Sequence, residues 1–318
     1  MKVSVIVPMY NVEQYLEECL QSLAAQTLQD MEVLIVNDGS TDHSPEIAQK
    51  FVSEHPDRFA LLHKPNGGLS DARNYGVRYA KGQYIAFLDS DDFVEPELYE
   101  KLLNKIEEGY DVVVTDIEYW YTEVSRRFVM KGLTDWPVKD VQKRAMLSPM
   151  FAWNKLYRAD FFTEKGLAYP LNTWYEDIPV TTMIFAQTSK IGYLQECLIH
   201  YRQREGSIMQ NNDSPRLVEI FGIMELLRKN FAENGYTDRF RNELEYLHVE
   251  HLRLYGMFRF IRSNHWSEYY ESSQEVMRTY YPDWKKNPYI KYLNTKNRVF
   301  LQFYNKFTAF LFNKVIGG

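Results

Sequence analysis

Residues 84–92 read Tyr-Ile-Ala-Phe-Leu-Asp-Ser-Asp-Asp, an apolar run that ends in three carboxylates. A short run with aromatic and β-branched members predicts a strand buried in a parallel sheet. Because alternate residues of a strand share a face, we expect Asp89 and Asp91 to point the same way. Two carboxylates this close repel each other unless a cation neutralises them, and oxygen-only ligands suit Mg²⁺ or Mn²⁺. The alternative is an acidic turn that caps the next helix, since Asp is common at helix N-caps.

The elements that would position this segment alternate between strand and helix over residues 1–115. This alternation predicts a doubly wound, mostly parallel α/β sheet. Asn11 and Gln14 resemble a capping box at the start of the first helix, with Asn in place of the usual Ser or Thr. Besides the run before Asp89, expected strands lie at 3–7, 31–36, 59–63 and 111–115, and expected helices lie at 12–23, 44–53 and 69–80.

Asp, Asn and Gly residues gather in the loops that follow these strands. Sheets of this kind bind ligands beyond the carboxyl ends of their strands, where all of these loops would meet. The pattern therefore indicates a ligand site at that edge. The loops cover residues 8–11, 37–42, 64–68 and 89–92, and the loop 64–68 leads into the helix that carries Asp71, Arg73 and Asn74.

The second half of the chain is organised differently. Residues 116–212 mix short strands, including 190–193 and 198–201, with short helices. From about residue 215 the apolar residues follow helical spacing. We expect one catalytic domain over 1–212 and a helical C-terminal region over 213–318.

Composition limits the classes of protein. Of the 318 residues 45% are apolar and 25% charged, as in ordinary globular proteins, and no apolar run approaches the ~20 residues of a transmembrane helix. The N-terminus lacks a signal peptide's long apolar stretch. Cys19 and Cys197 form neither a metal-ligand pattern nor a disulfide framework. These features predict a cytoplasmic protein.

Charge is unevenly distributed. Residues 285–318 contain seven basic and no acidic side chains, which leaves 30 basic and 43 acidic residues in the rest. The acidic body argues against a nucleic-acid partner. Residues 299–316 interleave aromatic, aliphatic and basic side chains, as in an amphipathic helix on an anionic membrane surface. A last helix docked on the acidic body is the alternative.

Seven segments in this order resemble the family 2 glycosyltransferases, which have the GT-A fold. The later ones look like those of bacterial members that build surface polysaccharides. Together they cover about residues 1–212, whereas the C-terminal third matches no pattern. The segments are 5–11, 36–42, 66–74, 88–92, 153–157, 174–177 and 201–208.

The resemblance implies a UDP-sugar site. Pro8 and Tyr10 would lie against uracil, with Asp38 and Asp71 accepting hydrogen bonds from uracil N–H or ribose hydroxyls. For Asp38 the alternative is a simple Asp-Gly turn, and for Tyr10 a packed aromatic. Arg73 would pair with phosphate or hold the acidic cluster. The implied nucleotide-binding set is Pro8, Tyr10, Asn11, Asp38, Asp71, Arg73, Asp89, Ser90, Arg202, Arg204 and Ser207.

The resemblance also implies a metal ion, Mn²⁺ or Mg²⁺, that neutralises charge on the departing UDP. Asp91 would be the direct ligand and Asp89 would serve ribose or a metal-bound water. His200 would complete the metal shell or stack in the core. Arg202 and Arg204 would clamp the diphosphate, because their forked N–H groups match phosphate oxygens.

Glu176 and Asp177 resemble the family's catalytic pair. Asp177 would take the proton of the acceptor hydroxyl, supported by Glu176. The alternative is helix N-capping ahead of 178–179, which does not exclude a role as base.

The expected activity is inverting transfer of a hexose or N-acetylhexosamine to a hydroxyl of a polysaccharide or lipid-linked oligosaccharide. A homo-oligomer is compatible with the sequence. A nucleotidyltransferase is an alternative, although Pro8-Met9-Tyr10-Asn11 stands where that class carries a Gly-rich, cationic loop. A second alternative is a catalytically silent scaffold of the same fold.

Overall fold

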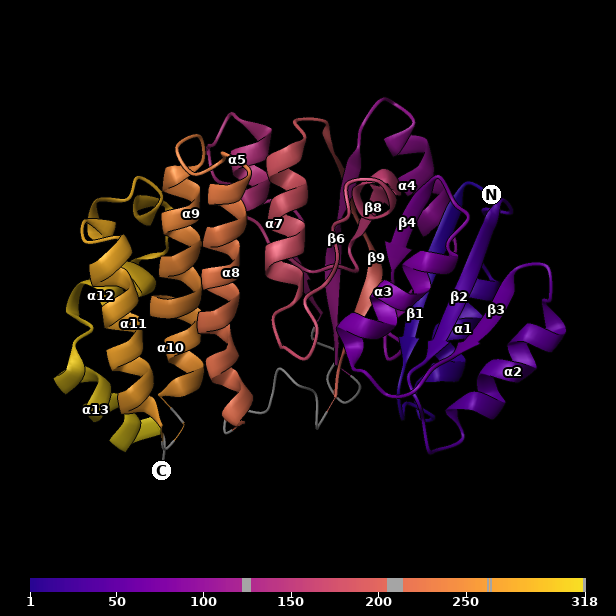
Figure 1. Cartoon of the computed structure of the whole chain (residues 1–318), viewed down its shortest axis with the longest axis horizontal. Coiled ribbons are helices and arrows are strands. Elements are labelled where there is room, and N and C mark those ends of the chain that lie inside the picture. The colour runs from indigo at the N-terminus through magenta and orange to yellow at the C-terminus, as the bar shows by residue number, and fades with distance from the viewer. Residues whose placement is uncertain (122–126, 205–213, 262, 264, 317–318) are drawn as a thin grey trace. The chain divides into compact units, whose positions relative to one another are not determined.

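The computed structural model describes residues 1–121, 127–204, 214–261, 263 and 265–316 (Figure 1). The chain divides into two compact units, Met1–Arg204 and Glu205–Gly318. The expected domain boundary at residue 212 lies in the stretch 205–213, outside the described residues, and stays a prediction.

Within the described part of the first unit, one mixed sheet has nine strands in the order β3-β2-β1-β4-β8-β6-β9-β5, with β7 paired to β6. Strands β3, β2, β1 and β4 run parallel, which confirms the predicted doubly wound part of the sheet (Figure 1). The strands are β1 Val3–Met9, β2 Met31–Asn37, β3 Phe59–His63, β4 Tyr84–Phe87, β5 Phe93–Val94, β6 Val112–Tyr121, β7 Phe128–Met130, β8 Lys155–Arg158 and β9 Ile191–Gln203.

The helices of the first unit cover this sheet and bury its strands β1 and β2. Every residue of β1 and of β2 is buried, as expected for strands covered on both faces. Helix α7 is mostly apolar and buried along nearly its whole length. The helices are α1 Leu16–Ala24, α2 Ser44–Glu54, α3 Leu69–Tyr79, α4 Leu98–Ile106, α5 Val141–Met146, α6 Asp160–Thr163 and α7 Asp177–Gln187.

Two strand predictions are corrected. Strand β4 ends at Phe87, so Asp89 and Asp91 lie in the following turn and the shared-face reasoning does not apply to them. The strands expected at 190–193 and 198–201 are one strand, β9, whose register against β6 shifts beside Thr115. The polar residues in this irregularity resemble a loop when the sequence is read alone.

The predicted capping box is also corrected. Helix α1 begins at Leu16 without a side-chain cap. Asn11 adopts a positive φ of 50° and its Oδ1 accepts a hydrogen bond of 2.8 Å from the Thr41 backbone N–H. This residue therefore joins two loops of the sheet edge.

The second unit is helical, as predicted. Its core contains Leu227, Phe231, Phe240 and Leu247, each without measurable exposure. None of the helices in the described ranges is both long and apolar enough to cross a membrane. The elements are η2 Pro215–Val218, α8 Glu219–Glu233, α9 Arg241–His248, the π-helical η3 Val249–Leu254, α10 Tyr255–Phe260, α11 Trp266–Tyr280, η4 Trp284–Lys286, η5 Ile290–Tyr292, α12 Thr295–Phe303 and α13 Lys306–Ile316.

Candidate active site

The loops after β1, β2 and β3 meet at one edge of the sheet, as predicted from the parallel pairing. The Asp38 carboxylate accepts hydrogen bonds from the backbone N–H groups of Gly67 (2.9 Å) and Gly68 (2.8 Å). Gly68 has a φ of 86°, which favours glycine at this position. Asp38 therefore fixes the loop that leads into helix α3.

Lys64 joins two of the predicted nucleotide-binding acids. Its Nζ lies 2.5 Å from Asp38 Oδ1 and 2.6 Å from Asp71 Oδ2, with the lysine side chain 6% exposed. Burial alone would lower the pKa of Lys64, but the hydrogen bonds to both acids outweigh it and raise the pKa. The sequence reasoning missed Lys64, although it is the one cation in the loop between β3 and α3.

Two predicted uracil contacts differ in their exposure. Pro8 is buried within β1, whereas the Tyr10 side chain is 50% exposed just beyond the strand. A half-exposed aromatic ring at this edge of the sheet is available to stack on a flat base.

Arg73 connects the acidic turn after β4 with the predicted catalytic pair. Its guanidinium, 3% exposed, donates to Asp89 Oδ1 at 2.8 Å and to Glu176 Oε1 at 2.7 Å. Burial opposes a charged guanidinium, but the two carboxylates outweigh it and raise the pKa of Arg73. In this structure Arg73 therefore holds the acidic cluster, one of its two expected roles.

The two arginines predicted to clamp a diphosphate lie against the turn at Asp91. Arg204 Nε donates to Asp91 Oδ2 at 2.6 Å. The buried Arg202 donates from Nε to the backbone oxygen of Asp91 (2.9 Å) and from a terminal nitrogen to Glu18 (2.5 Å). Glu18, on helix α1, is a partner that the sequence did not reveal.

Ser90 and Ser207 complete the predicted nucleotide set. Ser90 is buried and lies in the turn after β4. In this turn the Asp92 backbone N–H donates a hydrogen bond of 3.0 Å to the Asp89 carbonyl oxygen. Ser207 lies outside the described residues, so its role stays a prediction.

Asp89, Asp91 and Asp92 carry the carboxylate oxygens that a divalent ion would use as ligands. Asp92 is buried, and one of its oxygens has no hydrogen-bond partner among the described residues. Burial, with the negative charges of Asp91 and Asp89, raises the pKa of Asp92 well above its ordinary value. Among the described residues no three His, Cys, Asp or Glu side chains are arranged to hold a metal by themselves. The crowded carboxylate oxygens nevertheless fit a hard cation that shares its shell with a diphosphate.

His200 occupies a different environment. Its Nδ1 lies 2.7 Å from Glu118 Oε2, its Nε2 lies 2.8 Å from Glu95 Oε1, and its ring stacks on Phe93. Both nitrogens are engaged by carboxylates, so this arrangement matches the stacked alternative and gives no support to metal ligation.

The predicted catalytic pair begins helix α7. Asp177 is its first residue, and the preceding Glu176 makes no side-chain capping bond. Tyr175 has a positive φ of 64°, a strained conformation that occurs mainly at functional sites. The pKa of the half-buried Asp177 carboxylate is raised to about 7. The larger cause is the loss of water around the carboxylate, and the second is the negative charge of Glu176. A pKa near neutrality suits a general base.

Lys155 is a second buried cation that the sequence reasoning missed, although it lies in the Trp-Asn-Lys segment. Its Nζ donates to the Phe151 carbonyl and to Asn154 Oδ1, both at 2.6 Å. Burial lowers the pKa of Lys155 to about 7, and its charge opposes the rise in the pKa of Asp177.

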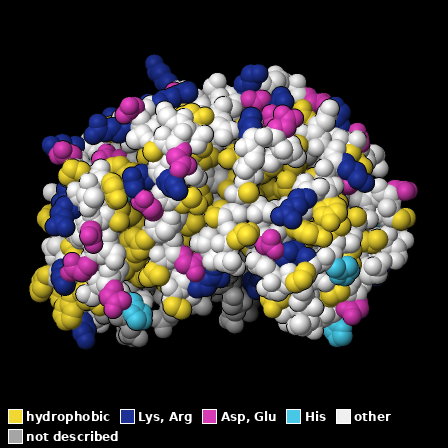
Figure 2. Space-filling view, in the orientation of Figure 1, with side chains coloured by type: hydrophobic (Ala, Val, Ile, Leu, Met, Phe, Trp, Pro, Cys, Tyr) yellow, Lys and Arg dark blue, Asp and Glu magenta, His cyan; other side chains and the backbone are white. Residues whose placement is uncertain are grey.

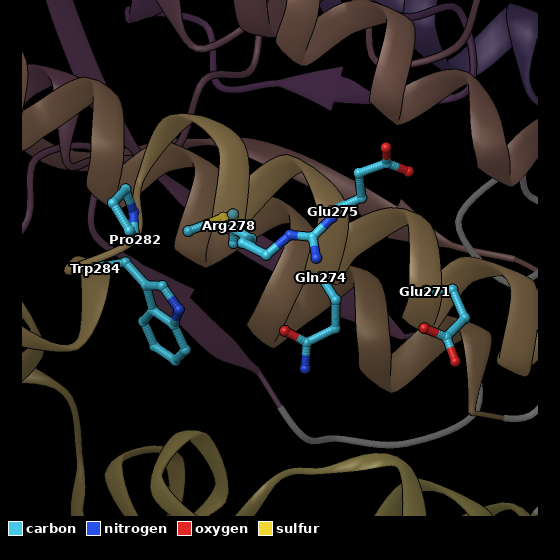
Figure 3. A pocket seen from close by; sticks show the side chains of 7 residues that line it. Glu271, Gln274, Glu275, Arg278, Pro282 and Trp284 are labelled. Atoms are coloured by element: carbon cyan, nitrogen blue, oxygen red, sulfur yellow. The ribbon is translucent and has the colours of Figure 1, made fainter.

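A pocket of about 470 Å³ belongs to the second unit alone. Side chains of helix α11 line it together with Pro282 and Trp284 (Figure 3). It contains none of the predicted site residues.

Three comparisons place the chain among known proteins. The protein named "Putative glycosyltransferase EpsH" of Bacillus subtilis (strain 168) is 31% identical over 267 residues, covering 78% of this chain and 74% of EpsH. The structure of S. aureus TarS residues 1–349 with UDP-GlcNAc has a TM-score of 0.60 at 19% identity, covering 95% of this chain and 78% of that one. The mannosyltransferase PcManGT of Pyrobaculum calidifontis, solved with GDP-Man and Mn²⁺, has a TM-score of 0.55 at 17% identity, covering 99% and 86%. The two structures agree with the GT-A fold that the resemblance implied.

The family model described as "Glycosyl transferase family 2" matches residues 4–164. These residues include the sheet edge, the acidic turn and Arg73. Together with the identity to EpsH, this match shows that the chain is a glycosyltransferase and belongs to glycosyl transferase family 2.

Proposed function

We propose that this enzyme transfers a hexose or N-acetylhexosamine from a UDP-sugar to a glycan hydroxyl, with inversion and with a divalent metal. The acceptor is a growing polysaccharide or a lipid-linked oligosaccharide. The observation that carries the proposal is the Arg73 guanidinium, which bonds Asp89 of the acidic turn and Glu176 of the catalytic pair. One buried cation thereby holds Asp89, on the side of the sugar donor in this proposal, close to Glu176, on the side of the acceptor.

The donor nucleotide would lie along the sheet edge. Tyr10 would stack on uracil, while Asp38 and Asp71 would accept hydrogen bonds from the base or ribose. Both acids are already oriented by Lys64 at 2.5 and 2.6 Å. UDP-GlcNAc in the structural neighbour TarS supports a uridine nucleotide.

Asp91 and Asp89 would hold Mn²⁺ or Mg²⁺, and the bound ion would neutralise charge on the departing UDP. The Mn²⁺ of PcManGT supports a divalent ion. Arg204, which now bonds Asp91, would also reach the diphosphate, since a guanidinium suits phosphate oxygens.

Asp177 would act as the base. It takes the proton of the acceptor hydroxyl as that oxygen forms its bond to the anomeric carbon. The bond between that carbon and the UDP oxygen breaks on the opposite side and its electron pair leaves with UDP. Attack opposite to the leaving group inverts the anomeric centre.

The test is Mn²⁺-dependent UDP release in the presence of a glycan acceptor. We expect Asp177→Asn and Asp91→Asn each to lose about 10²–10⁴-fold in rate. Asp57→Asn, at an exposed site between α2 and β3, is the matched control and keeps the rate of the original enzyme. Full activity in either site variant overturns the role assigned to that residue.

Calorimetry separates this proposal from its alternatives. Titration with UDP, UTP and NAD, each with and without Mn²⁺, should give metal-dependent binding of UDP. Preference for UTP would favour a nucleotidyltransferase, and UDP binding without turnover of any UDP-sugar would favour a silent scaffold.

We further propose that the enzyme works in the cytoplasm, at the inner face of the cell membrane, in peripheral contact through residues 299–316. The two cysteines, Cys19 and Cys197, are both free, as suits a reducing compartment. A lipid-linked acceptor would be presented at such a surface.

A further inference from the structure

The last two helices of the second unit and the turn between them have one packed side. Leu301 of α12, Tyr304 of the turn and Ala309 of α13 are each no more than 6% exposed. The Tyr304 ring lies 5.4 Å from the guanidinium carbon of Arg253, a buried cation of η3, and 5.6 Å from the ring of Tyr270. Helices α12 and α13 are therefore anchored to the other helices of this unit by part of their surface only.

Their other side carries large apolar side chains in water. Phe303 is 62% exposed and Phe307 is 68% exposed. Hydrophobic side chains gather over α13, at the lower left of Figure 2. Contiguous apolar surface of this kind marks an interaction site. We call this set the C-terminal apolar face; it consists of Val299, Phe303, Phe307, Phe310 and Leu311, each at least 43% exposed.

The charged side chains of helices α12 and α13 have one sign. Lys296, Arg298, Lys306 and Lys314 are exposed on the same two helices. Lys306 alone has an ion-pair partner in the described structure, Glu271, and that pair is largely solvated. Because residues 285–318 contain no acidic side chain, the segment has no negative charge to oppose an anionic partner.

We propose that the C-terminal apolar face lies on the surface of an anionic phospholipid bilayer, with the aromatic side chains inserted at the headgroup level and the basic side chains on the lipid phosphates. Helix α13, with 11 residues, is about 16 Å long and suits a position in the plane of the interface. A second copy of the chain is a poorer partner, because a two-fold contact sets the same cations against each other. This inference rests on the proposed peripheral location and specifies the surface and the lipid charge.

The test is flotation of the full chain with vesicles. We expect binding to vesicles of phosphatidylcholine and phosphatidylglycerol in equal amounts and much weaker binding to phosphatidylcholine alone. The double variant Phe303→Ser/Phe307→Ser should lose about tenfold or more in partition coefficient. The matched control, Phe128→Ser/Val129→Ser, changes two exposed apolar residues of β7 in the first unit and should bind like the original chain.

Charge is tested separately with Lys296→Glu/Lys314→Glu. Loss of each basic side chain should weaken binding to the anionic vesicles by about fivefold. Equal flotation of all variants, or equal binding to both vesicle types, overturns the proposal. A dimer that the Phe303/Phe307 variant converts to a monomer in light scattering also overturns it, because the face then serves self-association. UDP release with a water-soluble acceptor should stay unchanged in every variant, so vesicle binding and the proposed activity can fail independently.

Discussion

At the scale of single residues, Arg73 has the most consequential contacts in the site. A buried guanidinium with two carboxylates is stable because each charge compensates the others, and removal of one partner leaves the rest uncompensated. The contact with Glu176 is not visible in the sequence spacing, since Arg73 and Glu176 are 103 residues apart.

We expect Arg73→Met to lower the free energy of unfolding by about 3–5 kcal/mol at pH 7, because Asp89 and Glu176 lose their shared cation. Denaturant unfolding checks this value. Arg78→Met, at an exposed position of the same helix α3, is the control and should change it by less than about 0.5 kcal/mol. Similar losses in the two variants would contradict the role of Arg73.

The raised pKa of Asp177 makes a prediction about activity. A base works only when it has lost its proton, so kcat/KM should rise with pH and level off above about 7. A pH profile of the rate of UDP release measures this rise. A midpoint near the ordinary value of about 4 for aspartate would show that Asp177 is not the titrating base.

The raised pKa of Asp177 also makes the stability of the fold depend on pH, and here stability falls as pH rises. The folded chain holds the Asp177 proton more tightly than the unfolded chain does. The stability that this proton contributes is therefore complete below about pH 4 and is lost as pH rises through about 7. Asp177→Asn should therefore raise Tm by roughly a few degrees at pH 8 and leave it unchanged at pH 4. Thermal melts at both values test this, and a lower Tm at pH 8 would contradict it.

At the scale of elements, the site is built from loops that the sheet brings to one edge. The loop between β3 and α3 is fixed by the Asp38 carboxylate from the loop after β2, and Lys64 draws Asp71 to the same place. A nucleotide would meet preformed acceptors there, without the cost of ordering the loop.

We expect Lys64→Met to weaken UDP binding about thirtyfold, because two hydrogen bonds between charged groups are lost and the two acids are left to repel each other. Calorimetry with UDP and Mn²⁺ measures the change. Lys50→Met, at an exposed position of α2, should bind UDP like the original enzyme. Unchanged affinity in Lys64→Met would limit Lys64 to a structural role.

The local patterns predicted the elements well where each strand is short and continuous. The strands β1 to β4 and helix α3 were predicted close to their observed bounds because apolar runs and turn residues delimit them. Strand β9 was divided in two because its irregularity against β6 places polar residues inside a strand. The partners of Asp91 and Arg202 come from elements more than 100 residues away, which spacing along the chain cannot reveal.

At the scale of the whole molecule, every described residue of the candidate site belongs to the unit Met1–Arg204. We expect UDP with Mn²⁺ to protect backbone amides from hydrogen exchange in this unit, because ligand binding stabilises the segments that it contacts. Mass spectrometry of the exchanged peptides measures the effect. The described helices from α8 to α12 supply an internal control with unchanged exchange, whereas protection confined to them would contradict the site. The protected segments should be 8–11, 38–42, 64–74 and 89–92.

The position of Arg73 has a further consequence for the order of events. Its guanidinium bonds Asp89 directly, and both residues influence the proton affinity of Asp177 through their charge. In the proposed complex, the charge of a sugar nucleotide beside Asp89 would therefore also change the basicity of Asp177. Such coupling would link removal of the acceptor's proton to the presence of the sugar donor.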